Sequence, residues 1–235
     1  MKHEEKVWII IQARLGSTRL KNKMLLHFKG QSILSWSIQR LMKCKNVEGV
    51  AIAIPNNELD AKVLAQCIPQ EVRIFQGSSE DLCERYYHAA KELACTQVVR
   101  VCADNPLICP ELVDELIEFH LKNSVDYSWN HIPLNNQFPD GLGAEITSFQ
   151  TLEWIFSNAK GAQREHLFNV LRENKTLFHF GTYNPKDSKL CRPELKFDID
   201  TWDDYIYLNK FNFNVTMNAR EIIHEVDSYV NAGKK

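Results

Sequence analysis

The segment KVWIIIQARLGSTRLKNK (Lys6–Lys23) joins a largely apolar strand to a short cationic loop. Its first part, KVWIII (Lys6–Ile11), is the continuous apolar run expected of a strand buried on both faces of a sheet. The second part, QARLGSTRLKNK (Gln12–Lys23), holds one glycine, two hydroxyl residues and four cations in twelve residues. In α/β proteins, ligands bind where the carboxyl end of a strand meets the next segment, so this loop is expected to line a binding site.

The residue types of this loop suit a polyphosphate ligand. Gly16 lets the backbone come close to a ligand, and backbone amides can hold phosphate oxygens. Arg14, Arg19 and Lys23 can neutralise the charge of those oxygens. Ordinary surface charge is the weaker alternative, because the cations cluster with Gly16 at a strand end. The loop therefore indicates an enzyme that uses a nucleotide.

Length and composition are those of a globular protein: 235 residues, of which 44% are hydrophobic and 25% charged. This length fits one domain over residues 1–235, in which residues 125–185 are expected to be the less regular part. The net charge of −2 gives no electrostatic reason to expect binding to nucleic acid or to a membrane surface. No apolar run approaches the roughly 20 residues that a membrane helix needs.

The cysteines and the N-terminus favour a cytoplasmic location. The seven cysteines are an odd number without a C-x-x-C pair, so reduced thiols are expected rather than disulfides or a structural zinc site. The N-terminal MKHEEK is charged, and the strand after it is too short for the core of a secretory signal.

Strands and helices alternate through the first half of the chain. Further apolar strands are expected at Val50–Ile54, Val72–Phe75 and Val98–Cys102, each preceded by a helical stripe of apolar residues. Another helix is expected to begin at Pro110, because proline suits a first helical turn. This alternation predicts an α/β fold with a mostly parallel sheet that is flanked by helices on both faces.

The second half is less regular. Its expected strands are the one ending in Ser128–Asn130 and those at Ala144–Phe149, Thr176–Tyr183 and Leu195–Ile199. Its expected helices are Leu152–Ala159, Glu165–Arg172 and two more near the C-terminus. Thr201 and Asn218 are suited to cap these last two helices, the latter with Glu221 three residues later.

Aspartates at the ends of apolar segments are candidate metal ligands. Asp104 follows the strand Val98–Cys102, although Asp-Asn-Pro can also be an ordinary turn. Asp198 and Asp200, in FDIDTWDD (Phe197–Asp204), follow another apolar segment and share one face by period two. Carboxylates at two strand ends, together with a triphosphate, would supply the oxygen ligands that Mg²⁺ prefers.

Six segments, in this order, resemble the motifs of the cytidylyltransferases that activate acidic sugars, of the acylneuraminate and 3-deoxy-manno-octulosonate type. The resemblance is closest to the branch of that family concerned with spore-coat polysaccharide. The segments are QARLGSTRLKNK (Gln12–Lys23), QGSSEDLCERY (Gln76–Tyr86), ADNPLICP (Ala103–Pro110), PDGLGAE (Pro139–Glu145), REH (Arg164–His166) and IDTWDD (Ile199–Asp204). The chain departs from the usual pattern at Lys21, Gln76 and Trp202, where the family commonly has proline, arginine and proline.

The resemblance implies a Rossmann-like nucleotide-diphospho-sugar transferase fold and a role for each matching residue. The implied nucleotide-binding residues are Gln12, Ala13, Arg14, Gly16, Ser17, Arg19, Lys23, Gly77 and Ser78. The implied catalytic residues are Lys23, Arg14 and Asp104, and Asp104 and Asp200 would bind Mg²⁺. The implied acceptor-binding residues are Asp140, Glu145, Arg164 and His166. A homodimer would form through Asn130–Asp140 and Phe168–Tyr183.

Each acceptor residue also has a simpler explanation. Asp140 begins an Asp-Gly turn dipeptide, and Glu145 could be a solvated strand residue. Arg164 could be a surface charge and His166 a packed histidine. Ser78 could do no more than cap a helix.

The expected function is transfer of CMP from CTP to an acidic sugar or a related polysaccharide precursor, with release of pyrophosphate, in surface-polysaccharide biosynthesis. One alternative is a glycosyltransferase that uses a nucleotide sugar, for which Asp198-Ile199-Asp200 is formally a metal-binding D-x-D motif. The other is a nucleotide-binding subunit of the same pathway without catalytic activity.

Overall fold

The computed structural model describes residues 5–17, 19–131 and 134–232, and only the backbone of residues 58 and 59. Within these residues one sheet of seven strands has the order β5-β4-β1-β6-β8-β7-β9, and a small hairpin pairs β2 with β3. The strands are β1 Val7–Gln12, β2 His27–Phe28, β3 Gln31–Ser32, β4 Gly49–Pro55, β5 Arg73–Gly77, β6 Gln97–Cys102, β7 Tyr127–Trp129, β8 Glu145–Ser148 and β9 Phe180–Thr182.

The four strands of the first half form the parallel part of the sheet. β1 lies between β4 and β6 and is parallel to both, and β5 extends this part beyond β4. β8 is antiparallel to β6 and β7, and β9 is parallel to β7. The expected mostly parallel sheet is confirmed, and the four strands expected in its first half are present to within two residues at each end.

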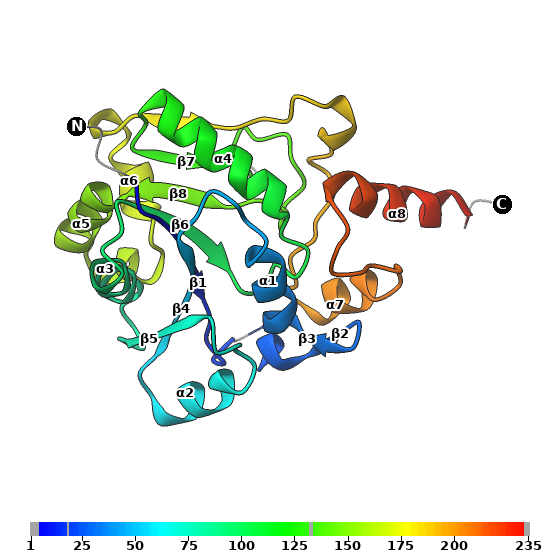
Figure 1. The fold of residues 1–235 in the computed structure, drawn as a ribbon, viewed down its shortest axis with the longest axis horizontal. Coiled ribbons are helices and arrows are strands. Elements are labelled where there is room, and N and C mark those ends of the chain that lie inside the picture. The colour runs from blue at the N-terminus through cyan, green and yellow to red at the C-terminus, as the bar shows by residue number, and fades with distance from the viewer. Residues whose placement is uncertain (1–4, 18, 132–133, 233–235) are drawn as a thin grey trace.

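Helices cover both faces of the sheet (Figure 1). They are α1 Ile33–Leu41, α2 Glu58–Ala65, α3 Leu82–Glu92, α4 Pro110–Asn123, α5 Phe149–Asn158, α6 Asn169–Glu173, α7 Trp202–Leu208 and α8 Ala219–Ala232. Because side chains alternate along a strand, Ile9 and Ile11 of β1 join the core formed with α1, α4 and α8. Ile10 joins the opposite core, formed with α3, α5 and α6.

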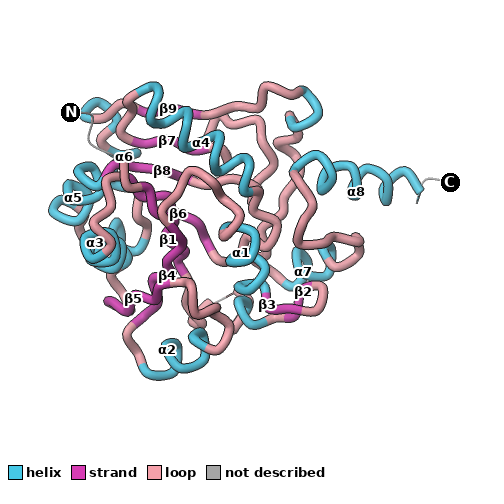
Figure 2. The backbone as a smooth tube through the Cα atoms, in the orientation of Figure 1, coloured by secondary structure: helices cyan, strands magenta, loops and turns pink. Residues whose placement is uncertain are grey.

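Three expectations for the second half are wrong in detail. Leu195–Ile199 is not a strand but an extended loop, in which Lys196 forms an isolated β-bridge with Asp140. Thr176–Tyr183 begins with a 3₁₀ turn and is a strand only at Phe180–Thr182. Glu165–Arg172 is split between the 3₁₀ turn Gly161–Glu165 and α6. Figure 2 shows how much of the chain between β9 and α7 is loop.

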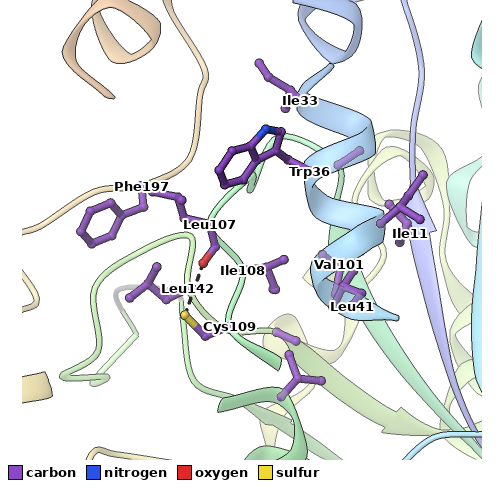
Figure 3. Packing of buried hydrophobic residues seen from close by; sticks show 14 of the residues in the cluster. Ile11, Ile33, Trp36, Leu41, Val101, Leu107, Ile108, Cys109, Leu142 and Phe197 are labelled. Carbon is purple, nitrogen blue, oxygen red and sulfur yellow. Dashed lines mark hydrogen bonds between the residues drawn. The ribbon is translucent and has the colours of Figure 1, made fainter. Parts of the chain in front are cut away.

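The apolar residues of Leu195–Ile199 are buried by loops instead of by neighbouring strands. Phe197 lies in the core near Leu107 and Leu142 (Figure 3). The backbone of the segment is bonded on both sides: Phe197 N–H donates to Asp140 O at 2.9 Å, and Ile199 N–H donates to Asp104 O at 2.9 Å. The alternating apolar residues are therefore buried here without a strand, because carbonyl groups of loops accept hydrogen bonds from the backbone N–H groups of the segment.

The expected helix caps are confirmed. Thr201 Oγ1 accepts the backbone N–H of Asp204, whose carboxylate accepts the N–H of Thr201 in return. Asn218 and Glu221 form the same reciprocal pair at the start of α8. These caps supply partners for the N–H groups that a helix leaves unbonded in its first turn.

None of the helices within the described ranges is long and apolar enough to pass through a membrane. The seven cysteines are free thiols. Burial raises the pKa of the Cys102 thiol, at the end of β6, to about 12. This thiol is therefore protonated at neutral pH, and its sulfur accepts a hydrogen bond from Arg100 at 3.2 Å.

Candidate functional site

The loops that follow β1 and β6 meet at one edge of the sheet and line a cavity of about 360 Å³. The two strands are parallel, and their last residues, Gln12 and Cys102, are register partners, so the loops after them start side by side. The loop after β1 contributes Arg14, Ser17, Arg19 and Lys23, and the loop after β6 contributes Asp104 and Asn105. The C-terminal part of the chain adds Asp198 and Asp200.

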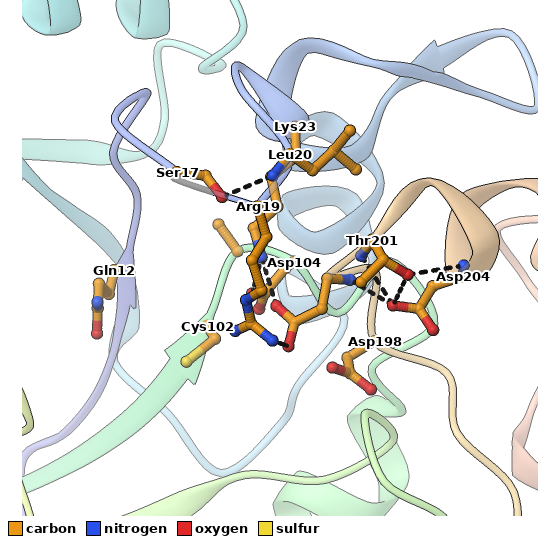
Figure 4. Close-up of polar contacts among 12 residues, drawn as sticks. Gln12, Ser17, Arg19, Leu20, Lys23, Cys102, Asp104, Asp198, Thr201 and Asp204 are labelled. Carbon is orange, nitrogen blue, oxygen red and sulfur yellow. Dashed lines mark hydrogen bonds and ion pairs between the residues drawn. The ribbon is translucent and has the colours of Figure 1, made fainter.

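Lys23 connects two carboxylates at the centre of this cavity. Its ammonium donates to Asp104 Oδ2 at 2.6 Å and to Asp200 Oδ1 at 2.8 Å, although the residue is only 7% exposed. Burial alone would lower the pKa of Lys23, but the two carboxylates outweigh it and the pKa is raised. Figure 4 shows Lys23, Arg19 and Asp104 converging in this way. Lys23 is therefore a charged ammonium that is hydrogen-bonded to both carboxylates.

Asp200 is positioned by its neighbours on the chain and by a second cation. Arg19 Nη1 lies 2.9 Å from Asp200 Oδ2. The backbone N–H of Asp200 donates to the carboxylate of Asp204, the same group that caps α7. Burial would raise the pKa of Asp200, but Lys23 and Arg19 lower it, so the carboxylate is ionised. The expected approach of Asp104 and Asp200 is thus realised through Lys23.

Asp198 lies in the same cavity but outside this ion cluster. Its Oδ1 atom is buried and has no hydrogen-bond partner among the described residues, and Oδ2 lies 3.4 Å from Lys196 Nζ. Burial and the neighbouring Asp140 raise the pKa of Asp198 to about 7. Asp198 and Asp200 both line the cavity, as their shared face predicts.

The nucleotide-binding residues implied by the resemblance lie in two places. Gln12, Arg14, Ser17, Arg19 and Lys23 line the central cavity. Gly77 and Ser78 line a separate hollow beyond β5, farther along the same edge of the sheet, together with Gln76. Ser78 Oγ also accepts the backbone N–H of Asp81, which caps α3.

Ala13 is buried, and its N–H donates to Ala53 O at 3.4 Å. Gly16 has a negative φ and open space around the position of a side chain, so the described residues give no steric reason for a glycine there.

Two of the four expected acceptor residues, Asp140 and His166, line the cavity. Glu145 is not a solvated strand residue: it is 1% exposed, and Arg100, Arg172 and Tyr127 donate to its carboxylate. Arg164 lies away from the cavity lining, where it pairs with Asp81 and donates to the carbonyls of Phe156 and Ala159. Its contacts connect the 3₁₀ turn Gly161–Glu165 to the start of α3.

Arg100 and His131 line the cavity but were missed by the sequence reasoning. Arg100 Nη2 lies 3.3 Å from Gln12 Oε1, and Arg100 also pairs with Glu145. His131 Nδ1 lies 3.4 Å from Asp140 Oδ1 and Nε2 lies 4.0 Å from Glu145 Oε2. The signal for Arg100 was a lone cation within the apolar strand VVRVC (Val98–Cys102); for His131 the sequence offers no local pattern.

His131 is expected to make the folded protein less stable as the pH rises from 6.5 to 9. Burial would lower its pKa, but Asp140 and Glu145 outweigh burial and raise it from 6.5 to about 9. The bound proton therefore stabilises the folded state fully below pH 6.5, and this contribution is lost as the pH rises through 9. Urea unfolding should show that the wild type loses about 2 kcal/mol more than His131→Gln across this range. Equal losses would contradict a charged imidazole at this position.

The departures from the family pattern lie at different depths in the structure. Lys21 is exposed on the cationic loop, and Gln76 lines the hollow beyond β5. Trp202 is the first residue of α7 and is 55% exposed. The tryptophan side chain, which is larger than the usual proline, therefore extends into solvent and leaves the cap at Thr201 intact.

Comparison with known proteins gives matches along nearly the whole chain. A family model described as cytidylyltransferase matches residues 8–224. The uncharacterised protein MJ1063 of Methanocaldococcus jannaschii is 36% identical over 223 residues, which are 93% of this chain and 89% of that protein. The spore coat polysaccharide biosynthesis protein SpsF of Bacillus subtilis is 28% identical over 205 residues, 85% of this chain and 83% of that protein. The 3-deoxy-manno-octulosonate cytidylyltransferase of Bdellovibrio bacteriovorus is 30% identical over 109 residues, 46% of this chain and 43% of that protein.

Solved structures agree with these matches. A cytidylyltransferase from Leptospira borgpetersenii superposes with a TM-score of 0.88 at 29% identity, covering 97% of this chain and 96% of that one. A CMP:2-keto-3-deoxy-manno-octonic acid synthetase, solved with CTP, superposes with a TM-score of 0.63 at 15% identity, covering 88% of this chain and 98% of that one. The second likeness concerns the fold alone, and it confirms the expected Rossmann-like fold.

Proposed function

Since the chain belongs to the cytidylyltransferase family, it is a CTP-dependent nucleotidyltransferase, and we propose that the cavity between β1 and β6 is its active site. One observation carries this proposal: three cations of one loop line the same cavity as Asp104 and Asp200, which come from distant segments. The cations Arg14, Arg19 and Lys23 suit a triphosphate, and the aspartates suit a metal ion that accompanies it. Family membership favours nucleotidyl transfer over the glycosyltransferase and over a subunit without activity.

The donor set fits Mg²⁺. Among the described residues no group of three or more histidine, cysteine, aspartate or glutamate side chains could hold a metal without further ligands. Mg²⁺ is usually bound by one or two carboxylates together with substrate phosphates and water, so a pair of aspartates is sufficient. Asp104 and Asp200 would hold it, since one ammonium already contacts both carboxylates. A bound Mg²⁺ would polarise the α-phosphate of the nucleotide.

The side chains of the chain itself bind and orient the reactants. Arg14, Arg19 and Lys23 neutralise the triphosphate and stabilise the leaving pyrophosphate. An oxygen of the acceptor forms a bond to the α-phosphorus in line with the bond to pyrophosphate, which breaks. Gln12 in the cavity, and Gly77 and Ser78 in the hollow beyond β5, are proposed to contact the base and ribose.

The acceptor is proposed to be an acidic sugar or a related polysaccharide precursor. The likeness to SpsF and to a 3-deoxy-manno-octulosonate cytidylyltransferase supports this class. Asp140, His166, Arg100 and His131 line the same cavity, and they are proposed to contact the acceptor. Glu145 is proposed to position Arg100, and Arg164 to hold the turn Gly161–Glu165 next to α3, without contact to the acceptor.

We further propose a cytoplasmic homodimer. The surface suggested for the contact is formed by Asn130–Asp140 and Phe168–Tyr183; residues 132 and 133 of the first segment lie outside the described residues. Exposed Leu134 and Leu177, at 41% and 63%, belong to these two segments and support the suggestion. Light scattering of the purified protein tests the proposed dimer, and the mass of a monomer would contradict it.

Nucleotide binding tests the proposed function directly. A ligand that binds only the folded state raises the melting temperature by mass action. We expect CTP with Mg²⁺ to raise it more than UTP, GTP or ATP do, and pyrophosphate release to follow when the correct acceptor is added. No rise with any triphosphate, but a rise with a nucleotide-diphosphate sugar, would favour the glycosyltransferase instead.

A further inference from the structure

The ammonium of Lys23 occupies the position between the two carboxylates that are proposed to bind metal. Its distances of 2.6 Å to Asp104 Oδ2 and 2.8 Å to Asp200 Oδ1 are those of strong, charge-assisted hydrogen bonds. The other oxygen of Asp200 is contacted by Arg19 at 2.9 Å. Both oxygens of Asp200 and one of Asp104 are therefore already engaged by cations of the chain.

The charges of this cluster cancel. Asp104 and Asp200 supply two negative charges, and Lys23 and Arg19 supply two positive ones. The side chains of the two aspartates are only 19% and 21% exposed and that of Lys23 is 8% exposed, so water screens the Lys23 contacts weakly. A divalent cation that approached this cluster would meet no net negative charge, and it would have to displace a buried ammonium.

We propose that Lys23 excludes divalent metal from the Asp104–Asp200 pair until the phosphates of a nucleotide take over its ammonium. The inference rests on the proposed function of this cavity. It means that metal does not bind before the nucleotide: a triphosphate draws Lys23 and Arg19 to itself, and the two carboxylates then become free for metal.

The loop allows Lys23 to change partners without refolding. Its backbone is fixed, because Leu25 N–H donates to Asn22 O at 2.9 Å and Leu26 N–H donates to Lys23 O at 3.1 Å. The four-carbon side chain is the movable part. Arg14 and Ser17 line the same cavity, so phosphates bound there would lie within the part of the site that Lys23 already reaches. Rotation of the side chain is therefore sufficient.

Two neighbouring acidic residues also contact groups of the chain. Asp198, two positions before Asp200, has its Oδ2 3.4 Å from Lys196 Nζ. The carboxylate of Asp204 accepts hydrogen bonds from the backbone N–H groups of Asp200 and Thr201. Within the described part of the chain, no group of three or more carboxylate, histidine or cysteine side chains could hold a metal.

Binding of Mn²⁺ in the absence of nucleotide tests this inference, with electron paramagnetic resonance of the free ion as the readout. The full-length Lys23→Met variant keeps the length of the side chain and removes its charge, so we expect it to bind Mn²⁺ at least tenfold more tightly than the wild type. Lys21→Met is the matched control on the same loop, and its affinity should equal that of the wild type. Adding Asp104→Asn to Lys23→Met should abolish the gain.

A second measurement covers the case in which Lys23→Met does not fold. The melting temperature of the wild type should not rise with Mn²⁺ alone, should rise with CTP alone, and should rise further with both. A clear rise with Mn²⁺ alone, or equal Mn²⁺ affinities for wild type and folded Lys23→Met, would overturn the inference. Because the Mn²⁺ titrations use no nucleotide, their result is separate from pyrophosphate release by the wild type, which tests the proposed function.

Discussion

Asp104→Asn and Asp200→Asn are each expected to lower kcat/KM for CTP roughly a thousandfold while the protein stays folded, which corresponds to about 4 kcal/mol of transition-state stabilisation. Both carboxylates contact Lys23 in the cavity and are the proposed metal ligands. Asparagine keeps the size of the side chain and one acceptor oxygen for Lys23 but removes the charge that a metal requires. Steady-state pyrophosphate release measures the effect.

Asp203→Asn is the matched control for these variants. Asp203 lies three positions after Asp200. It is exposed in the first turn of α7 and does not line the cavity. Its replacement should leave kcat/KM within about twofold, because a surface charge of this kind contributes little. Wild-type rates in either cavity variant would remove that aspartate from the reaction, whereas loss of activity in the control would indicate damage to α7.

The parts of the fold that sequence could predict are those in which local pattern and tertiary environment agree. The strands Val7–Gln12 and Gln97–Cys102 are apolar and lie inside the sheet, so their pattern and their burial lead to the same structure. The segment Leu195–Ile199 alternates apolar and charged residues, which is also typical of a strand, but among the described residues it pairs with no strand and is an extended loop. Strand prediction failed where the pairing partner, rather than the pattern, determined the outcome.

The candidate site shows the same division. Lys23 could be chosen from sequence as a cation of the loop after an apolar strand, and Asp104 and Asp200 because each lies just beyond an apolar segment. The contact of one ammonium with both aspartates could not be predicted, because Lys23 lies 81 positions before Asp104 and 177 positions before Asp200. Glu145 was placed on the acceptor side, but its burial depends on Arg172 of a distant helix, which no local pattern indicates.

Removing Glu145 is expected to destabilise the folded protein strongly. Its carboxylate is 1% exposed and accepts hydrogen bonds from Tyr127, Arg100 and Arg172, with His131 nearby. Burial would raise the pKa of Glu145, but these cations, Arg100 first, hold it well below its usual range. Glu145→Ala would leave the cations facing one another around a cavity, and breaking a buried pair in this way costs about 3–5 kcal/mol.

Thermal and urea unfolding measure this loss, and a fall in melting temperature of roughly 10 °C is expected for a chain of this length. Glu194→Ala is the control, because Glu194 also pairs with an arginine, Arg192, but is 60% exposed, and surface pairs contribute less than about 1 kcal/mol. If the two variants lose equal stability, water must reach the Glu145 network. A large loss confined to Glu145→Ala would show that this buried carboxylate holds β6, β8 and α6 together, and with them the cavity residues Arg100 and His131.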